Sequence, residues 1–138
     1  MKQLFVDSSG WIALYNRRDD QHQRAVSAFT GLVDSRVQFV TSDYIIDEAL
    51  THIRAWSSHA DAVKFGHLVR EHPLIEWIAV DGEVWSAAWD IFVRYDDQAF
   101  SFTDCTSFAI MRSRIIREAF TFDADFATMG FQVWPNDP

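Results

Sequence analysis

Four acidic residues, far apart along the chain, have positions that suit metal chemistry. They are Asp7, Glu48, Asp104 and Asp123. Asp7 follows the β-prone run LFV (4–6), and Asp123 follows EAFTF (118–122). Carboxylates that converge repel one another unless a cation neutralises them, and hard oxygen ligands suit Mg²⁺ or Mn²⁺. The pattern therefore predicts a metal site, for which a phosphodiester would be the natural substrate.

Short β-prone runs alternate along the chain with longer stretches of helical spacing. The expected strands are 4–6, 37–41, 74–80, 118–122 and 131–134. The expected helices are 9–17, 20–34, 42–57, 59–72, 82–95 and 102–116, with a short helix after Asp123. This alternation predicts an α/β fold, a three-layer α/β/α domain with a mainly parallel central sheet. Ligands of such sheets collect at the carboxyl ends of the strands.

Two serines mark the expected starts of helices that contain acidic residues. Ser42 precedes YIIDEAL, the segment with Asp47 and Glu48, and Ser101 has Asp104 three residues later. Asp104 could therefore complete a capping box, a structural role that is compatible with metal binding. The apolar stripe of the Ser42 helix leaves both of its acids at the margins, so periodicity does not choose between them.

Length and composition predict one globular domain over residues 1–138. An apolar share of 49%, with 12 Phe and 6 Trp, supplies a core for a chain of this size. The single cysteine, Cys105, excludes an internal disulfide framework. No apolar run approaches the roughly 18 residues of a membrane span, so we expect a soluble, cytoplasmic protein.

The net charge opposes simple binding of nucleic acid. The chain has 12 Lys and Arg against 20 Asp and Glu, a formal charge of −8. Broad neutralisation of phosphates requires the other sign, so local basic patches or bound cations must compensate. The densest basic cluster is Arg112, Arg114 and Arg117, which could contact RNA phosphates or form a solvated helix face.

Four segments resemble the signature segments of PIN domains, and are close to those of VapC ribonuclease toxins. They are VDSSGWIALYNRRDDQHQRA (6–25), TSDYIIDEAL (41–50), FSFTDCTSFAIM (100–111) and AFTFDADFATMGF (119–131). The resemblance implies that Asp7, Glu48, Asp104 and Asp123 are metal-binding, catalytic carboxylates. It selects Glu48 over Asp47, because the second acid of the family is a Glu at the head of an E-A-L-like turn.

The same resemblance implies neighbours for the metal. Ser8 or Ser9 and Thr121 are expected near the metal or its water, and Asp125 is a rival or auxiliary ligand to Asp123.

The implied activity is endoribonuclease cleavage with Mg²⁺ or Mn²⁺, as the toxin of a toxin–antitoxin pair. The implied partners are RNA, a second copy of the chain, and an antitoxin that covers the acidic site with an Arg or Lys. A catalytically silent binding module and a solitary RNA-processing nuclease remain alternatives. Receiver domains and haloacid-dehalogenase-like phosphatases are disfavoured because they need a lysine late in the chain, and the only lysines are Lys2 and Lys64.

Overall fold

The computed structural model describes residues 1–136 and has every element that the sequence predicts. The strands are β1 (Gln3–Val6), β2 (Gln38–Ser42), β3 (Ile75–Ile78), β4 (Glu118–Phe120) and β5 (Gln132–Trp134). The helices are α1 (Ser8–Tyr15), α2 (His22–Asp34), α3 (Asp43–Trp56), α4 (His59–Glu71), α5 (Gly82–Arg94), α6 (Phe102–Arg114) and α7 (Asp125–Thr128). The predicted elements are therefore confirmed, with small shifts at their ends.

The five strands form one sheet in the order β3-β2-β1-β4-β5, and every neighbouring pair is parallel. The expected mainly parallel sheet is thus entirely parallel in the described residues. Val6 pairs with Phe120, so the residues that follow, Asp7 and Thr121, leave the central strands side by side. The Asp7 amide donates to the Phe120 carbonyl at 3.1 Å, which extends this pairing to the start of the candidate site.

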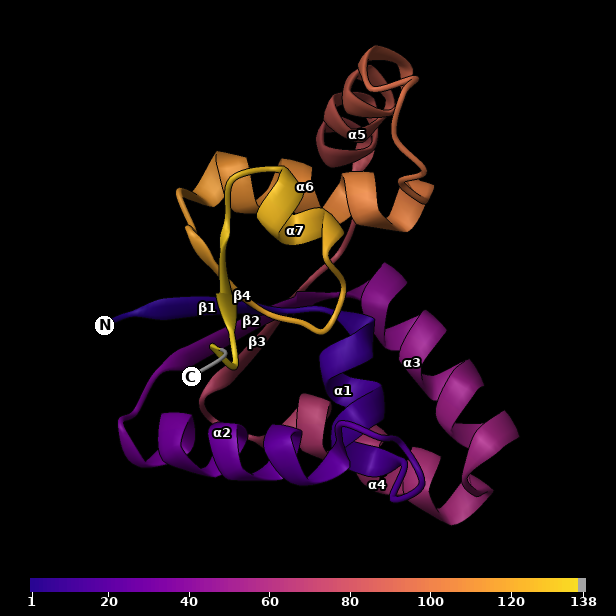
Figure 1. Cartoon of the computed structure of the whole chain (residues 1–138), viewed down its shortest axis with the longest axis vertical. Helices are drawn as coiled ribbons and strands as arrows, with labels where there is room; N and C mark the ends of the chain where they lie inside the picture. Colours follow the sequence, from indigo (N-terminus) through magenta and orange to yellow (C-terminus); the bar gives the residue numbers. More distant parts are fainter. Residues whose placement is uncertain (137–138) are drawn as a thin grey trace.

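Helices cover both faces of the sheet. In Figure 1, α6 and α7 lie on one side with α5 beyond α6, while α1, α2 and α4 lie on the other side. The α3 helix lies beside the carboxyl ends of the strands, next to α1. Because both faces are covered, the central strand is apolar throughout its middle, and Leu4, Phe5 and Val6 are fully buried. The α/β/α arrangement is confirmed.

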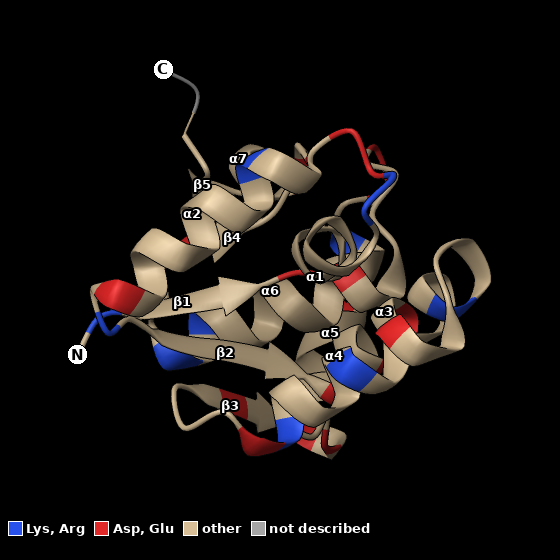
Figure 2. Cartoon of the chain, turned by 90° about the horizontal axis from the view of Figure 1, so that it is seen from below, with Lys and Arg blue, Asp and Glu red and all other residues tan. Residues whose placement is uncertain are grey.

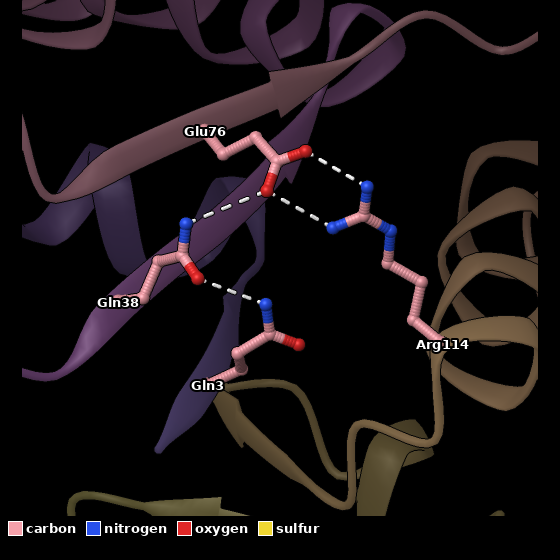
Figure 3. A network of polar contacts seen from close by, with 4 residues as sticks. All are labelled: Gln3, Gln38, Glu76 and Arg114. Atoms are coloured by element: carbon pink, nitrogen blue, oxygen red, sulfur yellow. Dashed lines mark hydrogen bonds and ion pairs between the residues drawn. The ribbon is translucent and has the colours of Figure 1, made fainter. Parts of the chain in front are cut away.

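A polar network joins α6 to the sheet (Figure 3). Arg114 donates two hydrogen bonds to the Glu76 carboxylate, at 3.0 and 2.8 Å. Gln38 donates to Glu76 at 3.5 Å and accepts from Gln3 at 2.9 Å. The hydrogen bonds from Arg114 lower the pKa of Glu76. This network occupies the Arg114 guanidinium at the carboxyl end of α6.

None of the helices in residues 1–136 is long and apolar enough to cross a membrane.

Candidate metal site

Asp7 is the buried centre of the candidate site. It follows β1 directly, and only 3% of its surface is exposed. Asp7 is also the N-cap residue of α1, but its side chain makes no capping hydrogen bond. Instead, its Oδ2 accepts hydrogen bonds from the Ser9 and Thr121 hydroxyls, both at 2.9 Å. A purely capping role for Asp7 is therefore excluded.

Ser9 and Thr121 are held in place by the chain that follows β4. The Phe122 amide donates to the Ser9 hydroxyl at 2.9 Å, and the Asp123 amide donates to the Thr121 hydroxyl at 3.0 Å. Each hydroxyl thus accepts from the backbone while it donates to Asp7. These bonds fix the orientation of the Asp7 carboxylate and join the ends of β1 and β4.

Asp104 reaches the site from the start of α6. The expected capping box is present: the Ser101 hydroxyl accepts from the Asp104 amide at 3.0 Å, and the Asp104 carboxylate accepts from the Ser101 amide at 3.1 Å. Burial, together with the charges of Asp7 and Asp123, raises the pKa of Asp104 to about 7, although hydrogen bonds with Ser101 oppose the shift. The capping box therefore positions an acid that also faces the other carboxylates.

The acids after β4 both belong to the cluster. One carboxylate oxygen from each of Asp104, Asp123 and Asp125 lies within 4.8 Å of the others, a spacing that could hold a metal ion. Asp123 is not the N-cap of α7, a position that Ala124 occupies, but it accepts a hydrogen bond from the Asp125 amide at 2.9 Å. The sequence predicted Asp125 as a rival or auxiliary ligand to Asp123, and the fold brings both carboxylates to the same place.

Glu48 lies at the margin of this cluster rather than inside it. It is exposed on α3, and the Ser8 hydroxyl donates a hydrogen bond to its carboxylate. Ser8 adjoins Asp7, so this contact directs Glu48 toward the site. Asp47 is also exposed, and both acids line a hollow of about 770 Å³ that extends to Thr103 beside Asp104. The contact with Ser8 distinguishes Glu48 from its neighbour.

Burial, with a smaller contribution from repulsion between the carboxylates, opposes the ionisation of these acids. Burial raises the pKa of Asp7 to about 6 despite the opposing hydrogen bonds of Thr121, Ser9 and Ser8, and the nearby charge of Asp123 adds to this shift. Burial and the charge of Asp123 also raise the pKa of Asp125. A divalent cation would remove this repulsion, and the donor set, carboxylate oxygens with hydroxyls behind them, fits Mg²⁺ or Mn²⁺.

The arginines singled out from the sequence lie far from this cluster. Since α6 begins beside Asp104 and runs back along the sheet, Arg112 and Arg114 are separated from it by roughly 12 to 15 Å of helix. Arg117 follows the same end of the helix. This separation follows from the eight to ten helical residues between Asp104 and these arginines.

The fold, the order of the segments and the convergent acids define a class of protein. The chain belongs to the PIN domain family, which it matches over residues 4–132. It is 34% identical to the 23S rRNA-specific endonuclease VapC20 of Mycobacterium tuberculosis, over 93% of this chain and 95% of that protein.

Two solved structures are also similar. The crystal structure of Mycobacterium tuberculosis VapC20, described as a sarcin–ricin loop cleaving toxin, has a TM-score of 0.83 and 33% identity over 93% of this chain and 95% of that one. FitAcB from Neisseria gonorrhoeae has a TM-score of 0.65 and 14% identity, over 94% of this chain and 95% of that one. The second likeness supports the fold alone.

Proposed function

We propose that this chain is a metal-dependent endoribonuclease that hydrolyses RNA phosphodiester bonds as a single-domain enzyme. The observation that best supports the proposal is the convergence of Asp7, Asp104, Asp123 and Asp125 at the carboxyl ends of the central strands. A 23S rRNA-specific endonuclease resembles this chain over nearly its whole length. Large ribosomal RNA is therefore the first substrate to test.

The chain's own residues supply the binding and orientation that the reaction needs. Asp7, Asp104 and Asp123 would hold Mg²⁺ or Mn²⁺, with Glu48 and Asp125 as outer ligands. The chemistry that such a cation supplies when bound is Lewis-acid activation of the phosphodiester and of an attacking water. Ser9 and Thr121 keep the Asp7 carboxylate fixed, so that little reorganisation is needed during the reaction.

We also propose a toxin role with an antitoxin as partner. The support is the relative whose structure is described as a toxin. An antitoxin segment with an Arg or Lys at the carboxylates would neutralise the same charges as the cation, and the formal charge of −8 favours a basic partner. Co-expression with a basic protein encoded beside this chain, and loss of cleavage on its binding, would support this role.

A homodimer is the third part of the proposal. The outer surface of α5 has a row of exposed apolar residues, which we call the α5 ridge: Trp85, Trp89, Phe92 and Val93, each 43% to 57% exposed. Trp85 and Trp89 stack with ring centroids 5.9 Å apart, and Trp85 also contacts Phe102 at 5.0 Å. Large exposed apolar patches that contain aromatic residues are typical of protein interfaces.

The catalytic proposal is tested by cleavage of a 23S rRNA fragment that contains the sarcin–ricin loop. We expect cleavage with Mg²⁺ or Mn²⁺, none in excess chelator, and losses of at least about 100-fold for Asp7→Asn and Asp104→Asn, because each removes a cation ligand. Glu48→Gln should reduce the rate, while the matched neighbour variant Asp47→Asn should not.

Two outcomes would contradict the catalytic proposal, and a third would contradict the toxin role. Equal cleavage by wild type, Asp7→Asn and Asp104→Asn would mean that a contaminating nuclease is responsible. Binding of RNA without any cleavage in either cation would favour the catalytically silent module. Cleavage only of small precursor RNAs would favour a solitary processing enzyme over a ribosome-directed toxin.

A further inference from the structure

The surroundings of the candidate metal site have few basic side chains that could bind a polyanionic substrate. The hollow that begins at Glu48 includes three carboxylates among its described lining residues, Asp43, Asp47 and Glu48, and no Lys or Arg. A hollow of about 560 Å³ beside Asp123 has one arginine, Arg24. Figure 2 shows Lys and Arg dispersed among Asp and Glu rather than gathered on one face. An RNA ligand must therefore obtain much of its electrostatic attraction elsewhere.

One groove on the protein has the opposite charge pattern. We call it the basic groove; it lies between α3 and α4, has a volume of about 390 Å³, and its lining includes Thr51, Arg54, His59, His67 and Arg70 beside small and apolar residues. No Asp or Glu is among these described lining residues. Arg54 and Arg70, both exposed, are the arginines of the groove, and Glu71, 3.4 Å from His67, lies at its edge.

The basic groove adjoins the hollow that is lined by Asp43, Asp47 and Glu48. Thr51 lines both of them. Glu48 and Arg54 are six residues apart on α3, a rise of about 9 Å along the helix and a turn of about 120° around it, with the exposed Thr51 midway between them. An RNA strand with one phosphate at the carboxylates can therefore place a neighbouring part of its backbone beside Arg54.

We propose that the basic groove is an anchoring site for the sugar–phosphate backbone of the RNA substrate, outside the bond that is cleaved. The proposal rests on the endoribonuclease function proposed above. Arg54 and Arg70 bind phosphates, which positions the RNA without reading its sequence. Anchoring at a distance from the metal site lets an acidic protein hold RNA while its carboxylates remain free for the cation.

The binding test uses wild type, Arg54→Gln/Arg70→Gln and the matched control Arg36→Gln/Arg94→Gln, which removes two exposed arginines elsewhere. The probe is a fluorescent 20-nucleotide single-stranded RNA in chelator, measured by anisotropy over a range of salt. We expect the groove variant to bind roughly tenfold more weakly, with a log–log salt slope smaller by about 1.4, or about 0.7 for each lost phosphate contact. The control should bind like wild type, and Arg54→Lys/Arg70→Lys should recover most of the affinity.

A cleavage test separates anchoring from damage to the metal site. In Mg²⁺, kcat/KM for a 30-nucleotide RNA should fall in the groove variant, while cleavage of a dinucleotide, too short to reach the groove, should not change. Melting temperatures of all variants show whether each still folds.

The outcomes for the two proposals are distinct. A groove variant that binds RNA like the control, or a wild type without RNA affinity in chelator, would overturn the anchor. If the groove variant binds RNA normally but loses affinity for a glutamate-rich amphipathic peptide, the groove binds a protein partner. That result would also overturn the anchoring proposal. The nuclease function is judged separately, by the cleavage of wild type against Asp7→Asn.

Discussion

At the scale of single residues, the main feature of the protein is a set of acids whose environments oppose their ionisation. Asp7 is the extreme case, because it is buried and has only neutral hydroxyls and backbone groups as hydrogen-bond partners. Burial and the nearby charges of Asp7 and Asp123 likewise oppose the ionisation of Asp104. Without a cation, the folded protein relieves this strain by binding protons, so metal and proton compete for the same oxygens.

The metal-free protein should become less stable as pH rises from about 4 to 7. The folded pKa of Asp7, about 6, is above its usual value of 3.8, so the folded state binds more protons than the unfolded state within this window. The cost for Asp7 is at most about 3 kcal/mol, and it is fully present above pH 7. Thermal melting in chelator should therefore give a higher Tm at pH 5 than at pH 8.

Two comparisons test the cause of this pH dependence. Asp7→Asn should flatten the profile, because the amide has no proton to gain. Saturating Mg²⁺ should stabilise wild type more at pH 8 than at pH 5, since ligands must be deprotonated to bind. If the metal-free protein were more stable at pH 8 than at pH 5, the surroundings of these acids would not oppose their ionisation.

At the scale of elements, the site depends on how closely α1 packs on β4. Gly10 lies in the first half of α1, where an added Cβ would come within 2.5 Å of the Phe120 ring and 2.9 Å of the Phe120 carbonyl oxygen. The Phe120 carbonyl also accepts the Asp7 amide, so this contact region adjoins the metal site. A helix residue without a side chain is therefore required for Asp7, Ser9 and Thr121 to meet.

Gly10→Ala should destabilise the protein by about 1 to 3 kcal/mol, the usual cost of overpacking a close contact, and should lower cleavage. The matched control is Gly31→Ala in α2, where no atom lies within 4 Å of the added Cβ. That variant should be neutral or gain up to about 1 kcal/mol from helix propensity. Chemical denaturation checks both, and equal stability of the two variants would contradict the packing argument.

At the scale of the whole molecule, the apolar α5 ridge and the basic groove occupy different parts of the surface. The α5 helix, which carries the α5 ridge, lies on one side of the sheet beyond α6 (Figure 1), while the basic groove is formed by α3 and α4. A second copy docked on the ridge would leave the basic groove available to RNA. Trp85 contacts Phe102, close to Asp104, so assembly and the site are structurally connected.

Trp85→Gln/Trp89→Gln should convert the proposed dimer to a monomer, because it removes the two stacked rings of the α5 ridge. Light scattering after size exclusion should show a fall from twice the chain mass to the chain mass of 16.0 kDa. The control is Trp77→Gln, which alters an exposed tryptophan on β3 outside the ridge. A wild type that is monomeric at high concentration would exclude the ridge as a self-association surface.

The features that depend on short-range pattern could be predicted from the amino-acid sequence. Apolar periodicity predicted each strand and helix, and the spacing of Ser101 and Asp104 predicted the capping box, because these depend on neighbours within a turn. The proposed acids were also identifiable from the sequence, although the choice of Glu48 over Asp47 required the family resemblance.

Which side chains lie together depends instead on the packing of distant segments. The strand order puts β4 beside β1, and this brings both Asp123 and Asp125 to the cluster while Glu48 stays at its edge. The direction of α6 carries Arg114 away to Glu76, and the packing of α3 on α4 creates a groove from arginines 16 positions apart. These outcomes depend on contacts between distant segments, which local periodicity does not encode.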